Sequence, residues 1–77
     1  MKKKIKRFIM ENLPMTSEAS VHKGVLRGNV LCDLDSAGAT VDIVDYGHCL
    51  MELKEEQALV ILGDKVIPTQ YGINLYN

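Results

Sequence analysis

Residues 58–67 read Ala-Leu-Val-Ile-Leu-Gly-Asp-Lys-Val-Ile, two short apolar runs on either side of a Gly-Asp pair. A Gly-Asp pair in this position is typical of a two-residue turn between antiparallel strands. Loop length sets the register of a hairpin, so a turn at Gly63 and Asp64 fixes the cross-strand partners. The predicted pairs are Val60 with Ile67 and Ile61 with Val66.

Turn signals continue toward the N-terminus and recur 7 to 10 residues apart from residue 21 onward. They are Gly28-Asn29, Ser36-Ala37-Gly38, Tyr46-Gly47-His48 and Glu55-Glu56. This spacing is typical of an antiparallel meander and is too short for helical crossovers. Extending the register through these turns places one apolar set of side chains in the core. The set is Val25, Cys32, Leu34, Val41, Ile43, Cys49, Met51, Leu53, Ala58, Val60, Leu62 and Ile67.

The N-terminal segment has helical periodicity instead. Ile5, Phe8, Ile9 and Leu13 share one face at helical spacing, and Pro14 limits the helix. The sequence therefore predicts a single α+β domain over residues 1–77. Its parts are a basic amphipathic helix at 2–12, a linker at 14–20 and a β-rich region at 21–76 that forms an antiparallel meander sheet or small β-barrel of about six short strands.

Charge divides sharply along the chain. Residues 1–7 contain five cations and no acid, whereas residues 8–77 hold 4 cations and 10 acids, a net charge of −6. The near-neutral total of −1 thus combines a basic head with an acidic body. The basic helix either docks on the acidic body or stays free for a partner, and both alternatives remain open at this level.

The second face of the predicted sheet suggests a protein-binding surface. It carries an acidic row of Asp33, Asp42 and Glu52 beside an apolar row of Leu26, Leu31, Val44, Leu50, Ile61 and Val66. So many aliphatic residues need a cover, from the N-terminal helix or from a partner. Tyr71 and Tyr76, in a tail that could pair at a sheet edge, extend this candidate surface.

A nucleic-acid-binding role is the alternative. Its candidate residues are the cations Lys2, Lys3, Lys4, Lys6, Arg7, Lys23 and Arg27, which could neutralise phosphates. The net charge of the body and the scarcity of aromatic side chains, at 5%, weigh against it.

Other function classes lack a motif. No nucleophile pair, phosphate loop or metal-ligand spacing is present, so we expect no enzyme activity, no cofactor and no metal. No apolar run is long enough to span a membrane, and the two cysteines, without an export signal, favour a cytoplasmic protein with reduced thiols. The sequence favours a small non-enzymatic binding or regulatory module that acts through protein contacts, and a homo-oligomer stays open because so small a core is marginal.

Overall fold

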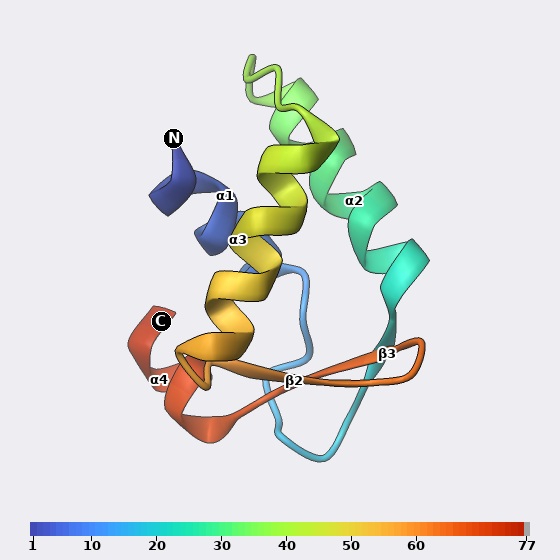
Figure 1. Ribbon diagram of the computed structural model, residues 1–77, viewed down its shortest axis with the longest axis vertical. Coiled ribbons are helices and arrows are strands. Elements are labelled where there is room, and N and C mark those ends of the chain that lie inside the picture. Colours follow the sequence, from blue (N-terminus) through green and yellow to red (C-terminus); the bar gives the residue numbers. More distant parts are fainter. Residues whose placement is uncertain (77) are drawn as a thin grey trace.

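The computed structural model describes residues 1–76 and has four helices and a three-stranded antiparallel sheet within them (Figure 1). The elements in chain order are α1 (Lys2–Glu11), β1 (Val21–His22), α2 (Lys23–Ser36), α3 (Ile43–Glu55), β2 (Leu59–Leu62), β3 (Lys65–Pro68) and α4 (Gln70–Tyr76). The fold is α+β as predicted, but the prediction of a six-stranded meander or barrel is wrong. Residues 23–36 and 43–55, assigned to strands from their turn signals, are helices.

The amphipathic N-terminal helix is present nearly as predicted. Ile5 and Ile9 are fully buried in it, while the helix ends at Glu11, three residues before Pro14. α1 contacts α2, α3 and α4, so its apolar face forms the centre of the core. Of the two alternatives for the basic helix, the structure therefore has it docked on the protein's own body.

Helix α2 begins at the cap residue His22, whose Nδ1 accepts a hydrogen bond from the Gly24 amide at 3.1 Å. Leu26, Val30 and Leu34 follow at spacings of four and are all fully buried. This spacing describes one face of a helix, and it overrides the local turn signal of Gly28-Asn29 that lies within it.

Helix α3 is capped by Asp42, whose Oδ1 accepts a hydrogen bond from the Val44 amide at 2.9 Å. Its buried residues are Tyr46, Cys49, Leu50 and Leu53, again at helical spacing. The predicted turn at Tyr46-Gly47-His48 is therefore wrong, because it lies in the middle of this helix. The helix ends with the amide of Ala58 bonded to the Leu53 carbonyl, 2.9 Å away, and Gln57 in the left-handed region at φ 65°.

The hairpin of β2 and β3 has the predicted register: Val60 pairs with Ile67 and Ile61 with Val66. Strand β3 also pairs with β1, which joins Val21 to Val66, so the strand order is β1-β3-β2. Figure 1 shows this sheet at one end of the helices, below α2 and α3 in the view.

The predicted core was only partly right because its register assumed strands. Leu34, Cys49, Leu53 and Ala58 are buried, and Val41 and Ile67 are partly buried. The other six are exposed: Val25, Cys32, Ile43, Met51, Val60 and Leu62. For Val25, Cys32, Ile43 and Met51, period-2 alternation was applied to residues that follow a 3.6-residue period. Val60 and Leu62 lie on a strand as predicted, but on its exposed face.

Helix α4 packs through a glycine against the connection between α3 and β2. A Cβ on Gly72 would overlap the carbonyl oxygen of Ala58, so only glycine permits this approach. Thr69 holds the same junction, because its Oγ1 accepts a hydrogen bond from the Gly72 amide at 3.0 Å and donates one to the Gln57 carbonyl at 2.6 Å.

Candidate binding site

A half-open groove lies between the first halves of α2 and α3 and the β2–β3 turn, with a volume of about 340 Å³. Ile43, Tyr46 and Leu50 of α3 give it an apolar wall. Gly47 also lines it, and no atom lies within 4 Å of the position that a Cβ on Gly47 would take. The groove is therefore apolar and has open space directly over the α3 backbone.

Two cations lie on the α2 side of this groove. They are Lys23 and Arg27, and neither has an ion pair among residues 1–76. Asp64, in the β2–β3 turn, is the one carboxylate among the lining residues described. The start of α2 adds the partial positive charge of a helix N-terminus. The groove thus combines an apolar wall with a net positive rim.

Tyr46 is the polar residue of the apolar wall. Its side chain is 3% exposed, and its hydroxyl is buried without a hydrogen-bond partner among residues 1–76. Burial raises the pKa of Tyr46 to about 12, while the nearby Arg27 charge works in the opposite direction. The tyrosine therefore stays neutral and contributes mainly aromatic surface.

A second apolar surface lies on the side of α3 that faces solvent. Ile43, Val44 and Met51 are 53%, 55% and 46% exposed. We call these three residues the α3 apolar face. Residues 43, 47 and 51 are spaced about one helical turn apart. Ile43 also lines the groove, so the α3 apolar face and the groove adjoin.

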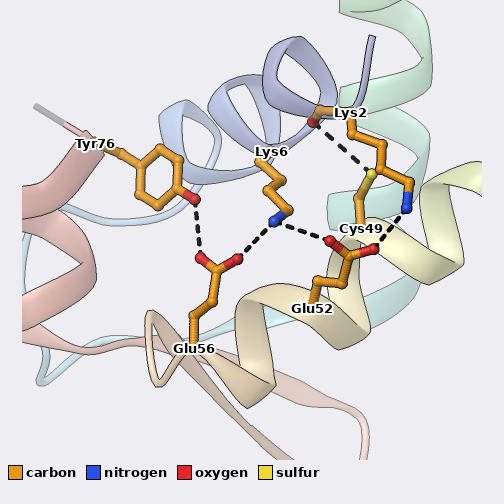
Figure 2. Close-up of polar contacts among 6 residues, drawn as sticks. All are labelled: Lys2, Lys6, Cys49, Glu52, Glu56 and Tyr76. Atoms are coloured by element: carbon orange, nitrogen blue, oxygen red, sulfur yellow. Dashed lines mark hydrogen bonds and ion pairs between the residues drawn. The ribbon is translucent and has the colours of Figure 1, made fainter.

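A polar cluster on the opposite side of α3 fixes α1 in place (Figure 2). The Lys6 ammonium lies 2.6 Å from Oε2 of Glu56 and 3.1 Å from Oε1 of Glu52, and Lys2 lies 3.0 Å from Oε2 of Glu52. Tyr76 of α4 donates a hydrogen bond to Oε1 of Glu56 at 3.1 Å. The cluster is a set of contacts within the chain and joins three helices.

The charges of this cluster stabilise one another. Hydrogen bonds from Lys2 and then Lys6 lower the pKa of the Glu52 carboxyl, and the hydrogen bond to Glu56 raises the pKa of Lys6. Burial, followed by the bond to Glu56, raises the pKa of the Tyr76 hydroxyl. At neutral pH the cluster holds two cations and two anions and is electrically balanced.

Cys49 lies beside the cluster and is fully buried, with its Sγ donating a weak hydrogen bond to the Lys2 carbonyl at 3.8 Å. Burial raises the pKa of this thiol, which makes the thiolate scarce at neutral pH. Among residues 1–76, no group of three His, Cys, Asp or Glu side chains is arranged to hold a metal ion.

The residues predicted to bind a protein do not share one face, because the expected sheet face does not exist. Asp33 accepts a hydrogen bond from Asn12 at 2.9 Å, Asp42 caps α3 and Glu52 belongs to the polar cluster. The remaining five differ in exposure: Leu50 is buried, Leu31 and Tyr76 are half-buried, and Val44 and Tyr71 are exposed. Within this set, only Val44 belongs to the α3 apolar face and only Leu50 lines the groove.

The cations of the nucleic-acid alternative fall into separate groups. Lys2 and Lys6 are paired with glutamates, while Lys3, Lys4 and Arg7 are exposed on α1. Lys23 and Arg27 lie at the groove, on helix α2. The seven residues therefore do not form one continuous basic patch.

Sequence reasoning missed Ile43, Tyr46, Gly47 and Met51 as candidate binding residues. They were assigned to the core or to a turn. Tyr46 itself belongs to the buried set of α3. The helical spacing of Tyr46, Cys49, Leu50 and Leu53 is the signal that could have found the other three, because it leaves residues 43, 44, 47 and 51 on the outer face of a helix.

The chain matches no protein-family model, no curated protein and no solved structure. Its class is therefore defined by its own fold, a helix-rich α+β domain with a three-stranded antiparallel sheet. No helix within residues 1–76 combines the length and the apolar character needed to cross a membrane.

Proposed function

We propose that this protein is a small non-enzymatic binding module that acts through protein contacts made by the α3 apolar face. The observation that carries the proposal is the exposure of Ile43, Val44 and Met51 on one helix, at 46–55% each. Exposed aliphatic side chains that gather on one face mark interaction surfaces in proteins otherwise well packed. The groove beside them extends the same surface.

A cytoplasmic location belongs to the same proposal. Cys32 and Cys49 are both free thiols, and Cys32 is exposed, which suits a reducing compartment. The partner is a different protein or a second copy of this chain. The molar mass of the purified protein in solution distinguishes these two possibilities.

A nucleic-acid-binding role is the second candidate, and one observation favours it. Helices α2 and α3 in succession, followed by the β2–β3 hairpin, have the order of a winged helix-turn-helix, in which the second helix enters the major groove. Here Lys23 and Arg27 precede that helix.

The chemistry of α3 weighs against this second candidate. Its exposed face carries Ile43, Val44 and Met51, with Asp42 and Asp45 at its start. DNA readers of this kind present basic and amide side chains to phosphates and base edges, and carboxylates there would be repelled. The connection of residues 37–42 is also longer than the usual 3–4 residues.

The test is affinity capture with purified protein as bait, from a lysate treated with nuclease and from the same lysate untreated. We expect the wild type to capture a defined protein, and this protein, once purified, to bind the wild type directly. The double variant Val44→Asp, Met51→Asp should no longer capture it. Val25→Asp is the matched control, because Val25 is 54% exposed on a different helix. Capture that depends on nucleic acid, or that survives the double variant, would contradict the proposal.

A further inference from the structure

We infer that the groove between α2 and α3 binds an acidic peptide segment of a partner protein that inserts apolar side chains against the α3 wall. This inference rests on the proposed protein-binding function and adds the chemistry of the partner. The apolar wall, the two cations and Gly47 each support it.

The apolar wall selects for apolar side chains. Ile43, Tyr46 and Leu50 line the groove, and its volume of about 340 Å³ accommodates side chains of an extended or helical segment but no folded element. Amphipathic segments commonly bind grooves in this way, with a few apolar anchors in pockets. The Tyr46 hydroxyl is buried and does not make the wall polar.

The rim selects for negative charge. Lys23 and Arg27 have no ion pair among residues 1–76, whereas Lys2 and Lys6 of the same chain are both paired with glutamates. Asp64 opposes them, and Asp42 and Asp45 at the start of α3 lie outside the groove lining. The three charged side chains that line the groove therefore leave one net positive charge. Carboxylates of a peptide beside its apolar anchors would pair with the two cations, and electrostatic complementarity of this kind determines which partner binds.

Gly47 keeps the groove open. It lies in the middle of α3, where glycine is unfavourable for the helix, and no neighbouring atom would meet a Cβ there. Packing within this chain therefore gives no reason for a glycine. Gly28 of α2 is equally free of neighbours, but only Gly47 lines the groove, where a bound segment would lie across the α3 backbone.

The experiment measures binding of a fluorescein-labelled peptide of sequence EDLFEELDLFED by fluorescence anisotropy, with backbone amide shifts to locate it. We expect saturable binding that shifts the amides of Gly24, Arg27 and Gly47. Gly47→Leu, which fills the groove, and the double variant Lys23→Glu, Arg27→Glu should each weaken binding at least about tenfold. Gly28→Leu, a glycine of α2 that is also free of neighbours but outside the groove lining, should change it less than about twofold.

Three results with the peptide would overturn the inference. They are no saturable binding, equal binding by Gly47→Leu, and equal binding by the same peptide with lysine at every acidic position. Tighter binding of a short mixed-sequence DNA duplex that shifts the same amides would also overturn it. Circular dichroism checks that each variant is folded, and Gly47→Ala supplies a milder change if Gly47→Leu is not.

The outcome is separable from that of the capture experiment. If the peptide fails to bind but Val44→Asp, Met51→Asp still abolishes protein capture, the groove inference is wrong and the proposed function stands. If the peptide binds and capture does not depend on the α3 apolar face, the proposed surface is wrong.

Discussion

The Nζ atom of Lys6 lies 2.6 Å from Oε2 of Glu56, and this ion pair connects the middle of α1 to the residue that caps the end of α3. The Lys6 side chain is only 14% exposed, so the pair is better shielded than most surface ion pairs. Glu52, one helical turn earlier, shares the same ammonium. The basic character of α1 is therefore partly structural.

Replacing Lys6 tests this role. We expect Lys6→Met to lower the free energy of unfolding by on the order of 1 kcal/mol, a modest value because both carboxylates are more than a third exposed and partly screened by water. Lys4→Met, on the same helix but without an ion pair among residues 1–76, should change it by a few tenths at most. Urea unfolding at low salt measures both, and equal effects of the two variants would refute the structural role.

The polar cluster also predicts a pH dependence. Lys2 and Lys6 hold the pKa of Glu52 below its ordinary value, so the folded state binds fewer protons here than the unfolded state. The stabilisation is therefore present above the ordinary glutamate pKa and is lost as the pH falls through the lowered one. We expect Glu52→Gln to be less stable than the wild type at pH 7 and the difference to disappear as the pH falls below the lowered pKa of Glu52. Glu55→Gln, without an ion pair among the described residues, is the control and should show no such convergence.

Tyr46 carries a stability cost in its buried hydroxyl. Because that hydroxyl has no hydrogen-bond partner among residues 1–76, Tyr46→Phe removes a desolvated polar group without loss of a contact. We expect the free energy of unfolding to rise by about 1 kcal/mol. Thermal unfolding measures the change, and a decrease in the melting temperature would show that the hydroxyl is satisfied.

Gly72 is the residue least tolerant of a side chain. A Cβ there would overlap the Ala58 carbonyl, so Gly72→Ala must displace α4 or the end of α3, at a cost of about 2 kcal/mol or more. Gly28→Ala meets no neighbour within 4 Å and should instead stabilise its helix by about 0.5–1 kcal/mol. Opposite signs of the two effects in chemical denaturation are the expected result.

Gln57, at the end of α3, also occupies a backbone position that favours glycine. Its φ of 65° lies in the left-handed region, and the amide of Gln57 bonds to the Lys54 carbonyl at 3.1 Å in a capping motif that usually contains glycine. Gln57→Gly should therefore raise the free energy of unfolding by about 1 kcal/mol. Gln57→Ala is the control and should give no comparable gain.

Local sequence patterns were sufficient to predict an element whose conformation depends on residues close to it in the sequence. The helix before Pro14 was predictable because its apolar residues share one face, and the β2–β3 register followed from a two-residue turn at Gly63 and Asp64. The pairing of Lys6 with Glu56 could not be derived in this way, because 50 residues separate them and only the packing of α1 on α3 brings them together.

The middle of the chain shows where local patterns failed. Gly28 and Gly47, together with several β-branched residues, predicted turns and strands over residues 21–56, and each is locally unfavourable in a helix. The helical spacing of Leu26, Val30 and Leu34 was also present in the sequence, but it competed with those turn signals.

The sequence by itself determined the basic amphipathic α1, the β2–β3 hairpin with its register, and the separation of charge along the chain. Tertiary structure decided that α2 and α3 are helices, because burying their apolar stripes against α1 outweighs the weak helix propensity of their glycines and β-branched residues. It also decided the candidate site. Packing α2 and the β2–β3 turn beside α3 forms the groove, and packing α1 on the opposite side neutralises Lys2 and Lys6 while leaving Lys23 and Arg27 unpaired among the described residues.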